Sequence, residues 1–138
     1  MAETGAFLTG RRTFDVAGGW NGKHPWDVPA FVVTHEVPEG WPRPDSTVQF
    51  VTDGIESAVA QAKSAAGPKS VAVHGAETIQ QLLNAGQLDE IQVDVAAVLL
   101  GGGVRLFDHL GITPAALGDP VVVNGVGVTH LRYPVHPS

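Results

Sequence analysis

Short apolar runs alternate with helix-like segments along most of the chain. Runs at 6–9, 30–34, 48–51 and 70–74 are rich in apolar and β-branched residues, which is typical of buried strands. A helix between the third and fourth runs is predicted by apolar residues at helical spacing, namely Ile55, Ala58, Val59, Ala62 and Ala66. Strands that alternate with helices indicate an α/β fold with a mostly parallel sheet.

Turn-forming residues predict where the helices begin and end. Asp53 precedes the first long helix and Glu56 follows three residues later, so the pair is expected to form a capping box. Gly67 and Pro68 are expected to end this helix. Gly75 joins the fourth strand to a second helix, for which Gly86 is the expected C-terminal stop.

The last third of the chain is predicted to be mainly strand. Residues 88–100 read as one long strand that enters a turn at the three consecutive glycines 101–103. Apolar runs at 121–123 and 126–135 are separated by Asn124 and Gly125, a strong hairpin signal. We therefore expect a mostly parallel central sheet with a C-terminal antiparallel hairpin, all in one domain that spans 1–138.

Composition excludes several classes of function. The chain has no cysteine, which rules out disulfides and thiol chemistry and suits a cytoplasmic location. A net charge of −6 disfavours nucleic acid as a partner, and no apolar stretch is long enough to suggest a membrane span. The six histidines have no metal-ligand spacing, so no metal site is predicted. The three tryptophans fall in loops, where they either wall a pocket or anchor the loops: Trp20, Trp26 and Trp41.

Two strand-to-helix corners are candidates for binding an anion. At 10–13 a strand end meets a helical turn that carries Arg11 and Arg12, whose guanidinium groups suit a phosphate. At 73–79 a glycine lets a ligand approach the main chain at a helix start. Each corner also has a purely structural explanation, and for the glycine turn followed by Arg105 the structural explanation is favoured.

Six segments taken together resemble one known family. In chain order they are 5–14, 31–35, 50–58, 74–83, 88–91 and 99–107. They resemble the dihydrofolate-reductase-like domain family, in the form found at the C-terminal end of riboflavin-biosynthesis reductases. This resemblance implies a three-layer α/β fold, homodimers, and hydride transfer from NADPH to a small heterocyclic or pyrimidine-type substrate.

The resemblance also implies which residues contact NADPH, but it names no catalytic residue. The implied contacts are Gly10, Arg11, Arg12 and Thr13 around the phosphates, Thr34 and His35 beside the adenosine, Asp53 at the adenine, and Gly75, Ala76, Glu77, Thr78 and Ile79 under the pyrophosphate.

The sequence departs from the family pattern in three places. Ala76 stands where relatives usually have a second glycine, and Ala97 where they usually have proline. The strand and helix that relatives carry before the first corner are absent. In the family that strand lies between the strands equivalent to 70–74 and 91–99, so we expect these two strands not to pair directly. Either another segment fills the place, or this sequence is part of a longer chain.

Two other functions are compatible with the same residues. One is a non-catalytic nucleotide-binding or dimerisation module that keeps the scaffold. The other is a sugar-phosphate-binding protein that uses the anion corners and ignores nicotinamide.

Overall fold

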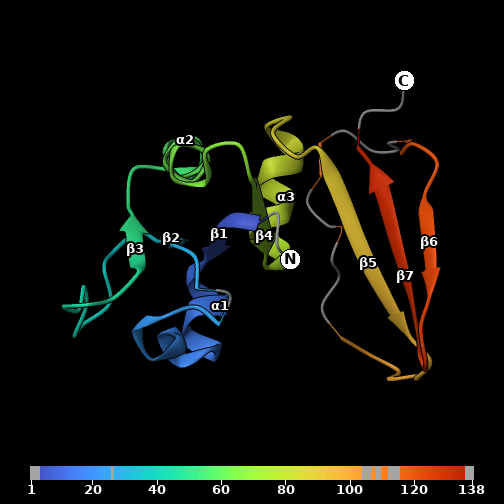
Figure 1. Ribbon diagram of the computed structural model, residues 1–138, viewed down its shortest axis with the longest axis horizontal. Coiled ribbons are helices and arrows are strands. Elements are labelled where there is room, and N and C mark those ends of the chain that lie inside the picture. Colours follow the sequence, from blue (N-terminus) through green and yellow to red (C-terminus); the bar gives the residue numbers. More distant parts are fainter. Residues whose placement is uncertain (1–3, 26, 104–106, 108–109, 112–115, 136–138) are drawn as a thin grey trace. The chain divides into compact units, whose positions relative to one another are not determined.

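The computed structural model describes residues 4–25, 27–103, 107, 110–111 and 116–135. The chain forms two compact units, Met1–Gln81 and Leu82–Ser138, and the division falls within one helix. Each unit is described by itself (Figure 1).

The first unit is built on a four-stranded parallel sheet. Its strands are β1 (Thr4–Gly10), β2 (Ala30–Val33), β3 (Val48–Val51) and β4 (Ser70–His74). They lie in the order β3-β2-β1-β4, so β1 is central and pairs with β2 on one side and β4 on the other. The four predicted strands are confirmed.

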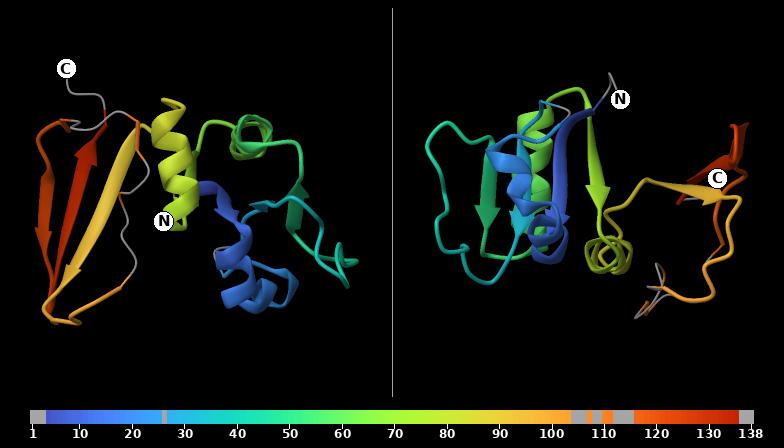
Figure 2. Two further views of the ribbon diagram at one scale, coloured as in Figure 1. Left: turned by 180° about the vertical axis from the view of Figure 1, so that it is seen from behind. Right: turned by 90° about the horizontal axis from the view of Figure 1, so that it is seen from below.

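Helices lie on both faces of this sheet. The elements are α1 (Arg11–Val16), the 3₁₀ turn η1 (Gly18–Gly22), α2 (Ile55–Ala66) and α3 (Ala76–Asn84). Figures 1 and 2 show α2 on one face, with α1 and η1 on the other. A Cβ on Gly5 would lie 2.8 Å from the carbonyl oxygen of Ala66, so this glycine lets α2 approach β1 closely.

The face opposite α2 carries an aromatic core. Phe7 and Phe14 are buried there, and Trp20 and Trp41 pack against them with edge-to-face rings. These two tryptophans therefore anchor their loops to the core. Trp26 lies outside the described residues.

The predicted start of α2 is wrong by one residue, but the predicted end of α3 is confirmed. Gly54 is the N-cap of α2 and no side chain caps this helix, because Asp53 lies one position too early to reach the free amides. At the end of α3, Gly86 has φ +69° and donates to Leu83, while Gln87 donates to Leu82. These are the paired bonds of a glycine-terminated helix.

The second unit contains a three-stranded antiparallel sheet. Its strands are β5 (Glu90–Ala96), β6 (Val121–Asn124) and β7 (Val128–Pro134), in the order β5-β7-β6. The predicted hairpin is confirmed, but its turn is not at Asn124 and Gly125. Gly125 donates to Val128 at 2.8 Å, so the loop residues are Val126 and Gly127, and Gly127 supplies the positive φ that the turn needs.

The strand predicted over 88–100 is shorter than expected. It ends at Ala96, which is paired with Val128, the first residue of β7. After Ala96, β7 gives way to the hairpin loop. The apolar residues at 98–100 therefore have no strand partner in this sheet, and their side chains are exposed.

The parallel and antiparallel strands form two sheets rather than one continuous sheet. β4 is the edge strand of the first sheet and β5 is an edge strand of the second. The expectation that these two strands do not pair directly stays a prediction, because β4 and β5 belong to different units. The α/β class and the antiparallel hairpin are confirmed, whereas the single domain over 1–138 stays a prediction.

Candidate functional site

The carboxyl ends of the four parallel strands meet at one edge of the first sheet. Each of the predicted cofactor segments follows one of them: 10–13 after β1, 34–35 after β2, 53 after β3 and 75–79 after β4. The parallel topology therefore brings these segments to a single edge. This is where open α/β sheets bind their ligands.

The two anion corners touch each other. A Cβ on Gly75 would lie 2.9 Å from Oγ1 of Thr13, and a Cβ on Gly10 would lie 2.8 Å from Oγ1 of Thr78. Gly75 also has φ +100°, a conformation that side chains disfavour. The start of α1 and the start of α3 are thus in contact across two glycines that leave no room for larger residues.

Threonine hydroxyls surround these glycines. Oγ1 of Thr9 donates to the carbonyl of His74 at 2.8 Å and ties β1 to β4 at the corner. Thr78 is buried in the first turn of α3, and Thr13 faces it from α1. By helix geometry the amides of Ala76, Glu77 and Thr78 have no partner within the helix, so this corner offers amide and hydroxyl donors together.

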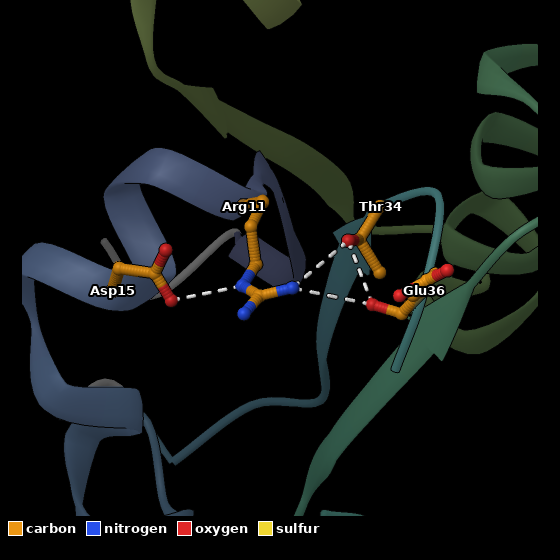
Figure 3. A network of polar contacts seen from close by, with 4 residues as sticks. All are labelled: Arg11, Asp15, Thr34 and Glu36. Carbon is orange, nitrogen blue, oxygen red and sulfur yellow. Dashed lines mark hydrogen bonds and ion pairs between the residues drawn. The ribbon is translucent and has the colours of Figure 1, made fainter. Parts of the chain in front are cut away.

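Arg11 joins the ends of β1 and β2 (Figure 3). Its Nε forms an ion pair with Asp15 at 2.9 Å, and its Nη1 donates to Oγ1 of Thr34 at 3.4 Å and to the carbonyl of Glu36 at 3.3 Å. Thr34 donates to the same carbonyl at 2.9 Å. Arg11 is therefore held in place by its own chain and positions Thr34.

The remaining charged groups at this edge are exposed. The side chain of Arg12 is exposed and forms no hydrogen bond or ion pair with the described part of the chain. Its guanidinium group is therefore available to an anion. Glu77 is an exposed carboxylate in the first turn of α3 and opposes an anion there. His35 and Asp53 are exposed, and Asp53 follows β3, which β2 separates from β1.

Residues 1–131 match the RibD C-terminal domain family. The chain belongs to this family. A similar solved structure is that of a protein from Shewanella sp. PV-4 assigned to riboflavin biosynthesis, which is 27% identical with a TM-score of 0.72. The match covers 98% of this chain and 76% of that chain. No curated protein matches.

Membership makes this chain a reductase-type domain of riboflavin biosynthesis with a dihydrofolate-reductase-like fold. Reductases of this type rely on a nicotinamide cofactor for the hydride. The β4–α3 corner fits the pyrophosphate of such a cofactor, because Gly75 keeps side-chain atoms away from the free amides of α3.

Sequence inspection of this RibD C-terminal domain missed two buried or stacked histidines. The imidazoles of His24 and His74 lie against the ring of Phe7, with centroids at 4.1 and 4.7 Å. Burial lowers the pKa of both histidines, and the pKa of His24 is lowered further by the charge of His74. Fifty residues separate them, so no local pattern indicated the pair.

These lowered pKa values predict that acid destabilises the first unit. The unfolded histidines have the ordinary pKa of 6.5 and bind protons more readily than the folded ones as pH falls below that value. The free energy of unfolding should therefore have its full value above about pH 6.5 and decrease as the pH falls below that value. Denaturant unfolding at several pH values, followed by tryptophan fluorescence, measures this effect.

The variant His24→Phe keeps a ring against Phe7 and should show a weaker decrease with acid. His35→Ala, which changes an exposed histidine, is the matched control. An unchanged pH profile in His24→Phe would contradict the explanation.

A second missed pair lies in the other unit. Nδ1 of His130 on β7 lies 2.6 Å from Oδ1 of Asp94 on β5. The hydrogen bond with His130 lowers the pKa of Asp94, and a bond from Gln92 at 3.3 Å adds to this. The partners face each other across paired strands, and 36 residues of sequence separate them.

The described residues contain neither a cluster of metal ligands nor a membrane-spanning helix. Within the described ranges, no three or more histidine or acidic side chains gather as metal ligands would. No helix among the residues that the structure describes has the length and apolar character needed to cross a membrane.

Proposed function

We propose that this chain binds NADPH at the carboxyl edge of the parallel sheet and is the reductase that transfers its hydride to a small heterocyclic substrate of pyrimidine type. The observation that carries the proposal is the contact between the β1–α1 and β4–α3 corners. This contact brings two glycines together with the threonine hydroxyls and the amides at the start of α3, which can donate hydrogen bonds to a ligand.

Each part of the edge has a role in this proposal. The free amides of α3 and the hydroxyls of Thr13 and Thr78 bind the pyrophosphate, and Arg12 pairs with a phosphate. Thr34, oriented by Arg11, and His35 lie beside the adenosine, with Asp53 near the adenine. The bound cofactor supplies the hydride, while the chain orients it and excludes water.

The order of the strands supports these roles. Along the edge, Asp53 follows β3, Thr34 and His35 follow β2, Arg12 follows β1 and Gly75 follows β4. An extended dinucleotide laid along this order would meet adenine, ribose and phosphate contacts in the sequence in which they occur in NADPH.

One observation weighs against a productive cofactor site and so favours a module that keeps the scaffold and binds nucleotide loosely, without catalysis. Ala76 and the carboxylate of Glu77 both occupy the first turn of α3, where they crowd and repel a pyrophosphate. Such a module would bind nucleotide and consume none when offered a pyrimidine-type substrate. A reductase would oxidise NADPH under the same conditions.

Calorimetric titration with NADPH tests the binding step. Arg12→Ala removes one charge-assisted phosphate contact and should weaken binding about tenfold. Lys69→Ala removes the same charge at the opposite end of the sheet, just before β4, and should leave the affinity unchanged.

Equal affinities of the two variants would contradict the assignment of Arg12. Binding of inorganic phosphate with indifference to NADPH would instead favour the sugar-phosphate-binding function.

A further inference from the structure

The η1 turn has a left-handed backbone. All five of its residues, Gly18–Gly22, have a positive φ, between +51° and +92°. Glycine adopts such values freely, but Trp20 and Asn21, at +51° and +52°, have a Cβ that crowds the following carbonyl in this conformation. Residues with a side chain enter the left-handed region singly rather than in runs, so the turn is strained. Other contacts are therefore needed to keep η1 in this form.

Hydrogen bonds to the segment before β3 provide one attachment. The carbonyl of Gly22 accepts from Oγ of Ser46 at 2.8 Å and from the amide of Thr47 at 2.9 Å. Oγ of Ser46 also accepts from the amide of Val48, the first residue of β3, at 3.0 Å. These bonds fix the last residue of the turn and leave its two strained residues to be held by other groups.

A group of stacked rings provides the second attachment. The ring of Trp20 lies edge-on to Phe7, with centroids 5.7 Å apart. The imidazole of His24, just after the turn, lies 4.1 Å from the ring of Phe7 and 5.1 Å from that of Trp20. His24 is only 6% exposed, and Phe7 also contacts His74 on β4 at 4.7 Å. The strained turn is thus held by a cluster that contains a buried titratable group.

We propose that residues 18–24 form a latch that is closed over Phe7 at neutral pH and opens in mild acid. A proton on His24 places a charge among buried rings, close to a second imidazole, and the charged form gains by reaching water. Opening also relieves the strain of Trp20 and Asn21. This inference goes beyond the reductase function and does not depend on it.

The charged groups around His24 decide the direction of the effect. His74 is the one titratable side chain on the described strands β1–β4. Burial lowers the pKa of His24 and the charge of His74 lowers it further, so these effects outweigh the attraction of a charged imidazole to ring faces. The other charged side chains on the elements around the turn are exposed or paired: Arg11, Arg12 and Asp15 on α1, Lys23 and Asp27 beside His24, and Glu39, Arg43 and Asp45 on the loop that carries Trp41.

Hydrogen exchange of backbone amides tests the latch, because two amides are protected by its closed form. They are Lys23, which donates to the carbonyl of Trp20 at 3.1 Å, and Thr47, which donates to Gly22. In the open form His24 regains its ordinary pKa of 6.5. The protection factors of both amides should therefore be constant above about pH 6.5 and decrease up to about tenfold by pH 5.5.

Low concentrations of denaturant distinguish this local opening from unfolding of the whole unit. Local opening exposes little surface, so exchange of Lys23 and Thr47 at pH 5.5 should not respond to denaturant. Exchange of Phe7, whose amide donates to Pro29 at 2.9 Å beside the central strand, should accelerate. An equal response of all three amides would overturn the latch.

Two substitutions change the strain in opposite directions and leave the rings in place. Gly18→Ala adds a Cβ at φ +62° with no atom within 4 Å, so it adds strain without a clash and should lower both protection factors about fivefold. Asn21→Gly relieves strain and should raise them. Gly67→Ala is the matched control, because Gly67 has φ +60° and equal space but lies at the end of α2, and it should leave both factors unchanged.

The variant His24→Phe keeps a ring against Phe7 but takes up no proton, so the decrease of protection in acid should be largely lost. An undiminished decrease in this variant would overturn the proposal. Protection factors that do not respond to Gly18→Ala and Asn21→Gly would overturn it as well.

Discussion

Replacing Gly75 with valine is expected to weaken NADPH binding about a hundredfold, because two charge-assisted hydrogen bonds to the pyrophosphate are lost. The new Cβ would lie 2.9 Å from Oγ1 of Thr13, and the branched side chain would stand between the cofactor and the amides of α3. The φ of +100° adds backbone strain of about 1–2 kcal/mol. Calorimetric titration with NADPH measures the loss.

Gly40→Val is the matched control for this substitution. Gly40 also has a positive φ, +82°, but a Cβ there would have no atom within 4 Å. It carries a similar backbone strain and leaves the corner intact, so its affinity should match that of the unaltered chain. Similar losses in both variants would show that strain, and not the corner, is responsible.

Replacing Phe7 with alanine is expected to lower the free energy of unfolding of the first unit by about 3–5 kcal/mol. Phe7 is buried at the centre of the sheet and packs against the rings of Trp20, His24 and His74. Its removal leaves a cavity between β1 and the loop that carries η1. Denaturant unfolding measures the change.

Tryptophan fluorescence suits this measurement because all three tryptophans belong to the first unit. Val16→Ala, at a position that is 85% exposed, should change the stability by less than about 0.5 kcal/mol. A loss in Phe7→Ala no larger than that of the control would mean that the aromatic cluster does not hold the unit together.

The sequence predicted the strands well because their signals are local. β3 and β4 match the apolar runs residue for residue, and Gly86 ends α3 as expected. The parallel topology follows from the alternation of strands and helices. This topology alone places the predicted cofactor segments at one edge of the sheet, so no tertiary contact had to be predicted.

What could not be predicted depends on small backbone shifts. Gly54 rather than Asp53 caps α2, and Val126 and Gly127 rather than Asn124 and Gly125 form the hairpin loop. In each case a nearby glycine with a positive φ, Gly54 or Gly127, lies at the position in question, and the sequence pattern alone does not say which of several candidate residues will take it.

Contacts between residues far apart in the chain could not be predicted from the sequence either. The hydrogen bond between Asp94 and His130 needs the register of β5 on β7, and the contact between Gly75 and Thr13 needs β4 beside β1. The division of the strands into two sheets could not be predicted for the same reason, because an apolar run predicts a strand but does not specify which strand it pairs with.

The central claim is that the adjoining β1–α1 and β4–α3 corners form one dinucleotide site. The most direct test is to add NADPH to the ¹⁵N-labelled chain and follow the amide resonances. We predict saturable shifts at 10–13, 34–35 and 75–79, with none along β6. Shifts confined to other residues, or none in a chain shown to be folded, would contradict the claim.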